Sequence, residues 1–62
     1  MTFPYSELAD CAKRELNMRK HVYPTRVAGR KMTRAKADRE MAMMLAIAEH
    51  FEKLASEKEQ LL

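Results

Sequence analysis

One stretch decides the fold: residues 33–62 read TRAKADREMAMMLAIAEHFEKLASEKEQLL. It contains no Gly or Pro, and it is dominated by Ala, Met, Leu, Glu and Lys, which all favour helices. Thr33 is a residue type that caps helix N-termini. We therefore expect one long helix over about 33–59, roughly 39 Å in length at about 1.5 Å per residue.

A helix of this length is too long for the rest of a 62-residue chain to cover. A chain of this size forms one domain, here residues 1–62, and buries only about 60% of the surface of its unfolded form. Disulfides, a metal ion or oligomerisation usually supply the missing stability. Cys11 is the only cysteine and the two histidines are far apart, which leaves oligomerisation and predicts a homodimer.

The N-terminal sequence MTFPYSELAD has neither the basic segment nor the apolar segment of a signal peptide. No run in the chain approaches the roughly 20 apolar residues that cross a bilayer. A lone cysteine is also typical of a reducing compartment. These features predict a cytoplasmic protein that has no membrane partner.

Two shorter elements precede the long helix. Ser6 can cap a first helix over about 6–22, and we expect Pro24 to end it, because the residue before a proline is displaced from the helical region. Pro24 also suits the first turn of a short elbow helix over about 24–28, and Gly29 suits the position just after its end. The expected fold class is all-α, a helical hairpin.

Charged residues lie in the middle of both apolar faces. On a helical wheel the first helix has an apolar arc, centred on Glu15 and Arg19, that consists of Leu8, Cys11, Ala12, Leu16, Met18 and Val22. Glu40 lies within the apolar face of the long helix. If the chain folds back on itself, Arg19 faces about residues 37–40. We therefore expect a buried ion pair between Arg19 and Glu40 that Glu15 extends.

The long helix carries more apolar surface than one partner helix can cover. If residues are counted outward from the elbow along both helices, the start of the first helix lies opposite about His50. Residues 51–62, with Leu61 and Leu62 at the end, then overhang by about 15–18 Å. The apolar side chains on and beside this overhang predict an interface with a second copy or with another protein: Met43, Ile47, Phe51, Leu54 and Ala55.

Basic residues crowd the elbow, since residues 19–39 contain eight Lys or Arg and one acid, Asp38. Such asymmetry is typical of phosphate-binding surfaces, and a basic helix after a turn is compatible with helix-turn-helix docking on DNA. The link over residues 22–33 is longer than the usual turn of that motif, however. A basic end that faces solvent or an acidic protein is therefore the simpler interpretation, and DNA binding is the alternative. The patch consists of Arg26, Arg30, Lys31, Arg34 and Lys36.

The sequence does not indicate catalysis. Cys11 lies on the expected buried arc, where a small core residue is the simpler interpretation than a reactive thiol. His21 and His50 fall near opposite ends of the expected hairpin, so they cannot share a metal ion. No nucleophile motif, phosphate-binding loop or metal-ligand spacing occurs. We expect a protein that is not an enzyme and has no catalytic residue, cofactor or metal.

Residues 14–47 resemble a pattern in small phage and prophage proteins. It combines a Glu-Leu-x-Met-Arg segment, a Val-Tyr-Pro segment followed by Val, Gly and Met, and an Ala-x-x-Glu segment. The matching positions are Glu15, Leu16, Met18, Arg19, Val22, Tyr23, Pro24, Val27, Gly29, Met32, Ala37 and Glu40. The resemblance covers just over half of the chain and implies a temperate-phage accessory protein made in the cytoplasm of a bacterial host.

The same resemblance implies a role in host takeover, because small phage proteins of this size often bind and disable a host protein. One type is the phage quorum-sensing anti-activator, a small helical dimer that binds a LuxR-type transcription regulator. Inhibitors of bacterial defence systems are compatible with the same features. We therefore expect a non-catalytic protein that binds and inhibits a host protein. The alternative is a small basic DNA-binding phage regulator.

Overall fold

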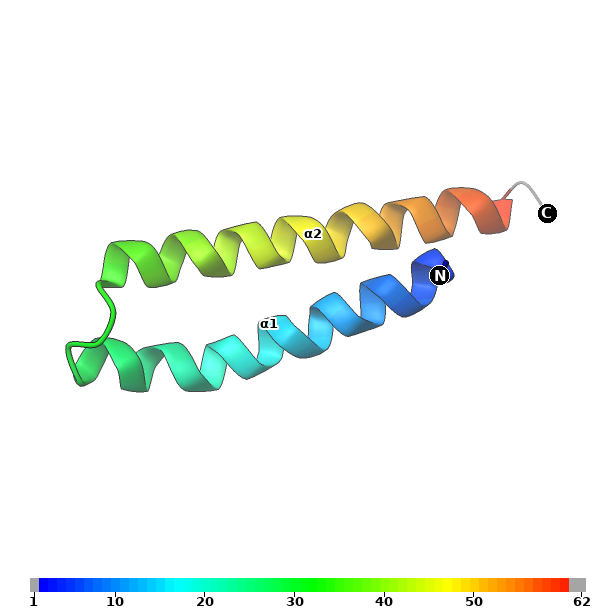
Figure 1. The fold of residues 1–62 in the computed structure, drawn as a ribbon. Coiled ribbons are helices and arrows are strands. Elements are labelled where there is room, and N and C mark those ends of the chain that lie inside the picture. Colours follow the sequence, from blue (N-terminus) through cyan, green and yellow to red (C-terminus); the bar gives the residue numbers. More distant parts are fainter. Residues whose placement is uncertain (1, 61–62) are drawn as a thin grey trace.

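The computed structural model describes residues 2–60, which form two antiparallel helices and no strand (Figure 1). α1 spans Tyr5–Ala28 and α2 spans Arg34–Gln60. The helices lie side by side, with their connection at one end, which we call the elbow. The start of α1 and the end of α2 lie at the other end, the open end. The expected all-α class and helical hairpin are confirmed.

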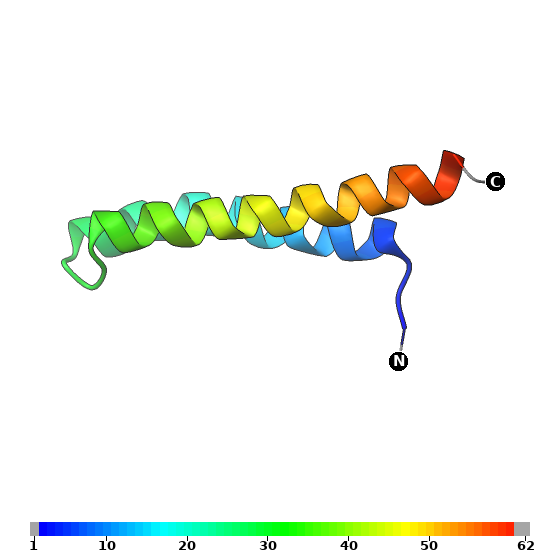
Figure 2. The same ribbon diagram turned by 90° about the horizontal axis from the view of Figure 1, so that it is seen from above.

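α1 begins one residue before the predicted cap. The carbonyl oxygen of Pro4 accepts hydrogen bonds from the backbone N–H groups of Glu7 and Leu8, at 3.1 and 3.2 Å. No side chain caps this end, so Ser6 lies in the first turn rather than before it. The arm that precedes α1 leaves the hairpin at an angle (Figure 2), and the side chain of Phe3 is exposed.

A separate elbow helix over 24–28 does not form, and that prediction is wrong. α1 continues through Pro24, which has no N–H group for the helical hydrogen bond. A proline inside a helix costs roughly 3 kcal/mol. The continuation half-buries Tyr23 and Val27 beside α2. Burying such side chains contributes up to about 1.5–3 kcal/mol each, which is of the same order as the cost of the proline.

A Schellman motif ends α1. The N–H of Lys31 donates to the carbonyl oxygen of Arg26 at 2.9 Å, and the N–H of Arg30 donates to that of Val27 at 3.1 Å, which are the two hydrogen bonds of this motif. Its left-handed residue is Arg30, with φ 60°, whereas Gly29 has φ −82°. The prediction that Gly29 takes the position after the helix end is therefore wrong by one residue.

α2 begins after a side-chain cap. The hydroxyl oxygen of Thr33 accepts a hydrogen bond from the N–H of Lys36 at 3.1 Å, and its carbonyl oxygen accepts one from the N–H of Ala37 at 3.0 Å. The first bond satisfies a backbone donor that a helix start otherwise leaves without a partner, and the second is the first hydrogen bond of the helix itself. Thr33 thus has the capping role that its place before the helix-favouring stretch predicts.

Small side chains fill the seam between the helices. The buried residues are nearly all alanine: Ala9, Ala12, Leu16, Ala37 and Ala48. They recur at spacings of three and four residues, or sums of these, as expected for two helices packed along their length. No large side chain among the described residues is fully buried. The hairpin by itself therefore has a thin core.

The buried stripe of α1 is rotated away from the predicted apolar arc. The prediction of burial is wrong for three side chains, which are exposed: Cys11, Met18 and Val22. The cause is the length of α1. Once Tyr5, Tyr23 and Val27 belong to the helix, its apolar positions centre on the side of Leu16 rather than on that of Cys11.

α2 extends beyond α1 by less than the sequence predicts. The ring of Tyr5 lies 6.2 Å from that of Phe51, and the ammonium of Lys58 lies 5.8 Å from the centroid of the Tyr5 ring. The first turn of α1 therefore reaches past His50. The predicted overhang is therefore wrong at Phe51, which lies beside the first turn of α1, whereas Leu61 and Leu62 lie outside the described residues.

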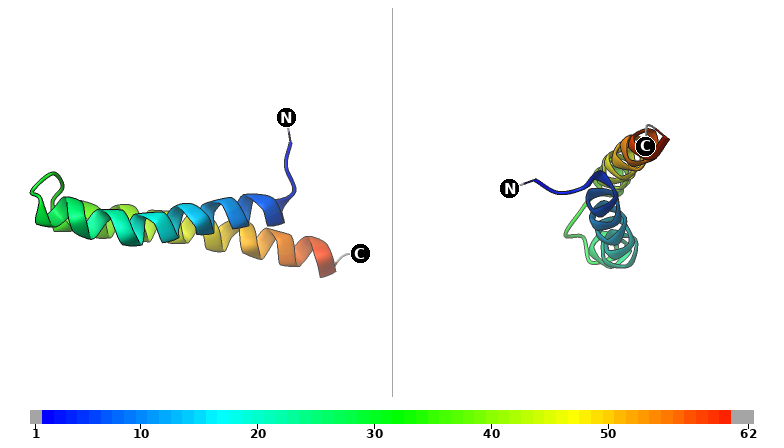
Figure 3. Two further views of the ribbon diagram at one scale, coloured as in Figure 1. Left: turned by 90° about the horizontal axis from the view of Figure 1, so that it is seen from below. Right: turned by 90° about the vertical axis from the view of Figure 1, so that its right-hand side faces the viewer.

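The hairpin is a rod. It measures 49 × 19 × 18 Å, and its radius of gyration is 14.4 Å, compared with about 10.6 Å for a compact domain of this length. Seen along the axis of the rod, the described part of the chain consists of two helices, and no further element within it covers their flanks (Figure 3). Neither of the two described helices has an apolar stretch long enough to cross a membrane.

Candidate interaction surfaces

An ionic cluster joins the helices. Nε of Arg19 donates to Oε1 of Glu15 at 3.0 Å, and Nη1 donates across the seam to the backbone carbonyl oxygen of Glu40 at 3.1 Å. Nη1 also lies 3.7 Å from Oε2 of Glu40. The structure brings these three residues together, but the side chain of Arg19 remains 22% exposed and both carboxylates are more exposed. The cluster is therefore half-buried, not buried.

Arg19 is held in place from more than one side. The hydrogen bond with Glu15 raises the pKa of Arg19 most; burial opposes this, and the charges of Tyr23, Glu15 and Glu40 add to the increase. The guanidinium carbon also lies 5.7 Å from the centroid of the Tyr23 ring, within the range of a cation–π contact. Because only one register brings Arg19 to the carbonyl oxygen of Glu40, the cluster fixes how the two helices align.

Exposed apolar side chains gather on the side of the hairpin that carries the two carboxylates of the cluster. Residues seven positions apart share one side of a helix, so Val22 lies on the side of Glu15 and Ile47 on that of Glu40. We name this surface the Ile47 flank. It consists of four side chains that are 36–53% exposed, Met18, Val22, Met43 and Ile47, with Leu8 and Leu54 half-buried toward the open end.

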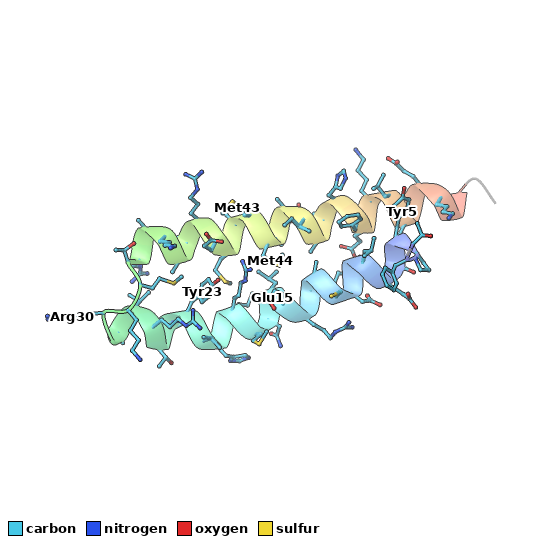
Figure 4. The ribbon with its side chains drawn as sticks, in the orientation of Figure 1. Tyr5, Glu15, Tyr23, Arg30, Met43 and Met44 are labelled. Carbon is cyan, nitrogen blue, oxygen red and sulfur yellow. The ribbon has the colours of Figure 1, made fainter. Side chains whose placement is uncertain are left out.

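The predicted partner or dimer interface divides between this flank and the seam. Three of its residues lie on the Ile47 flank: Met43, Ile47 and Leu54. Phe51 and Ala55 instead lie on the seam, seven residues after Met44 and Ala48, and α1 half-covers them. Figure 4 shows the difference, because Met44 points toward α1 while Met43 lies on the outer side of α2.

The opposite flank carries the exposed side chain of Leu45. Leu45 is 45% exposed, and Glu52, seven residues later, pairs with Lys13 across the seam at 2.6 Å. The hydrogen bond from Lys13 to Glu52 raises the pKa of this lysine, and both side chains are largely exposed. Leu45 therefore matches Ile47 in exposure but lies on the other flank.

The opposite flank is hollowed near the elbow, where Figure 1 shows the helices furthest apart. A groove of about 450 Å³ lies between the last turns of α1 and the first turns of α2. We name it the elbow groove. Its apolar residues include Tyr23, Val27 and Met41, and its charged ones include Lys20, Arg34 and Asp38. The groove does not follow from the helical patterns of the sequence; its signal is that Pro24, Ala28 and Ala37 have side chains too small to fill this part of the seam.

The five predicted basic residues are all exposed: Arg26, Arg30, Lys31, Arg34 and Lys36. None of them forms an ion pair with a carboxylate of the described residues. Arg30 projects from the tip of the elbow (Figure 4), and Arg34 also lines the elbow groove. The structure thus places a cationic end beside an apolar groove.

The titratable residues outside these surfaces are dispersed. Cys11 is exposed beside Glu7, Asp10 and Arg14, and the two histidines, His21 and His50, are also exposed. Within the described part of the chain, no three His, Cys, Asp or Glu side chains are placed to hold a metal ion.

No protein-family model matches the sequence, and comparisons with curated proteins and with solved structures give no match either.

Proposed function

We propose that this protein is a non-catalytic, dimeric inhibitor of a host protein. Two hairpins associate through their Ile47 flanks, and the dimer binds a bacterial transcription regulator, such as a LuxR-type quorum-sensing activator, or a defence component. The proposal is carried by one observation. Large apolar side chains are exposed on one flank of a hairpin whose buried residues are nearly all alanine.

The solvent-accessible surface area of the hairpin supports a stable interface with a partner. Its accessible surface is 5236 Å², whereas a compact monomer of 7.2 kDa exposes about 4100 Å². The difference, roughly 1100 Å², exceeds the ~800 Å² that each protein contributes to an interface of standard size. The Ile47 flank carries four of the exposed large apolar side chains, so it is the part that a partner is expected to cover.

The distribution of charge favours a second copy in antiparallel orientation. Residues 19–41 contain eight Lys or Arg and two acids. The remaining residues contain four Lys or Arg (12 less 8) and seven acids (9 less 2). The elbow half thus carries net +6 and the open half net −3. A two-fold axis across the Ile47 flank places each elbow half beside the open half of the other copy, which is electrostatically favourable.

Such a dimer leaves the opposite flanks and the basic elbows uncovered. It therefore presents two identical surfaces to a target, and two linked sites bind more tightly than one when the geometry allows both to engage. The resemblance of residues 14–47 to small phage proteins supports a host protein as the target. Covering the functional surface of a regulator inhibits it without any chemical step.

Target capture followed by reconstitution tests this function. The immobilised protein is incubated with bacterial lysate, captured proteins are identified by mass spectrometry, and the purified candidate is assayed alone and with the wild-type chain. We expect saturable inhibition that Ile47→Glu abolishes and that Ala46→Glu, which adds the same charge at an exposed position on the solvent side of α2, retains. A target that is bound without loss of activity, or the absence of any saturable protein partner, contradicts the proposal.

The basic elbow supports a second candidate function, a small DNA-binding regulator, because its five exposed cations gather at one end of the rod. A labelled random-sequence duplex, titrated by fluorescence anisotropy at about 50 and 200 mM salt, tests this function. Micromolar binding that falls steeply with salt supports it, because each phosphate contact releases counterions. Absence of binding at the lower salt concentration rejects it.

A further inference from the structure

The elbow groove has the size and lining of a site for a partner's side chain. Its volume of about 450 Å³ falls in the range of small-molecule pockets, about 300–1,000 Å³. It lies on the flank of Leu45, because Asp38, which lines it, is seven residues before Leu45. Dimerisation through the Ile47 flank therefore leaves the groove open.

Apolar side chains line the groove, and one of them is fixed by a further contact. Tyr23, Val27 and Met41 are all half-buried. The Tyr23 ring is in cation–π contact with Arg19, which the ionic cluster already holds, so the ring is positioned before any partner arrives. Figure 4 shows Tyr23 between the two helices. A pocket that is formed in advance favours insertion of a large apolar side chain.

The rim of the groove carries excess positive charge. Lys20 and Arg34 are exposed, and neither forms an ion pair with a carboxylate of the described residues. Asp38 is the one acid among the lining residues, and the basic elbow continues the positive surface beyond Arg34. Charge complementarity therefore selects a partner that is acidic on both sides of its apolar side chain.

We propose that the elbow groove binds an acidic segment of a partner protein, which inserts one large apolar side chain among Tyr23, Val27 and Met41 while its carboxylates contact Lys20 and Arg34. Nucleic acid explains less of the site, because phosphate contacts need the cations but not the apolar lining. This inference rests on the proposed function, since it names the chemistry of the target that the inhibitor recognises.

A peptide titration tests the groove directly. The probe is a fluorescein-labelled peptide, DEDFLDED, and its comparison is DEDSSDED, which keeps the charge and loses the apolar side chains. The double variant Lys20→Glu/Arg34→Glu alters the rim. Its matched control, Arg14→Glu/Lys53→Glu, makes the same change in net charge at exposed positions away from the groove. Circular dichroism checks that all variants retain their helices.

We expect saturable binding of DEDFLDED that weakens at least about tenfold in the rim variant, less than about twofold in the control, and at least about tenfold with DEDSSDED. Any one of several results overturns the inference. They are the absence of saturable binding at about 1 mM protein, an equal loss in rim and control variants, and equal affinity for the two peptides. Tighter binding of a random-sequence duplex than of DEDFLDED also overturns it, in favour of nucleic acid.

Different results contradict the groove assignment and the inhibitor function. If the captured host protein is inhibited equally by the wild-type chain and by the rim variant, the groove is not the recognition site, while the inhibitor function stands. If no host protein is inhibited although the peptides bind as expected, the inhibitor function fails and the groove assignment stands.

Discussion

Replacement of Arg19 by alanine removes the contacts that this side chain makes with Glu15, Tyr23 and Glu40. The charged hydrogen bond to the Glu40 carbonyl is worth about 1.5 kcal/mol at a half-buried site. The pair with Glu15, one helical turn away, adds about 0.3–0.5 kcal/mol, and the contact with the Tyr23 ring adds about 0.5–1 kcal/mol. We therefore expect Arg19→Ala to lower the free energy of unfolding by about 2–3 kcal/mol.

Arg14→Ala is the matched control, because Arg14 is exposed on the same helix and makes none of these contacts. Urea denaturation followed by circular dichroism, at one fixed protomer concentration, gives the difference between the two variants. For a domain of this size it corresponds to a difference in Tm of roughly 10–20 °C. A difference in unfolding free energy below about 0.5 kcal/mol refutes the structural role of the cluster.

Three further substitutions test the backbone and the seam by the same denaturation assay. Pro24→Ala restores a helical N–H group and is expected to stabilise the hairpin by about 2 kcal/mol, whereas destabilisation would indicate that α1 ends before this residue. Arg30→Gly places glycine at the left-handed position of the Schellman motif and is expected to stabilise by about 0.5–1 kcal/mol; a loss of stability argues against φ 60° there. Ala48→Leu overfills the seam and is expected to destabilise by about 1–3 kcal/mol, while Ala46→Leu, which points to solvent, stays within about 0.5 kcal/mol; equal effects would place Ala48 outside the seam.

The second helix could be predicted from local sequence because its determinants are local. Thr33 caps a long stretch of helix-favouring residues, and nothing in that stretch interrupts it. The meeting of Arg19 with Glu40 also followed from counting residues back from the elbow, since a hairpin with a short connection fixes which residues face each other.

The first helix could not be predicted in full, because local and tertiary preferences conflict at Pro24. Proline disfavours a helix by its missing N–H group, and only the packing of Tyr23 and Val27 beside α2 makes the continuation favourable. A first helix that ends at about residue 22 has a different apolar arc from that of α1. The prediction therefore places Cys11 in the core and makes the overhang of α2 too long.

The elbow groove was missed for a related reason. A groove results where side chains are too small to fill a seam. Ala28 and Ala37 line this groove together, but the sequence predicts that Ala28 belongs to a turn separate from the first helix. The Ile47 flank was foreseen only in part. Its α2 residues have an obvious apolar periodicity, but its α1 residues were assigned to the core.

The mass of the protein in solution tests most directly the central claim, that a second copy covers the Ile47 flank. Size-exclusion chromatography with light scattering is applied to the wild-type chain, Ile47→Glu and Leu45→Glu. We predict twice the chain mass of 7.2 kDa for the wild-type chain and for Leu45→Glu, and a monomeric or unfolded Ile47→Glu. A wild-type mass of 7.2 kDa at about 1 mM protomer, or an Ile47→Glu variant that retains the dimer mass, contradicts the claim.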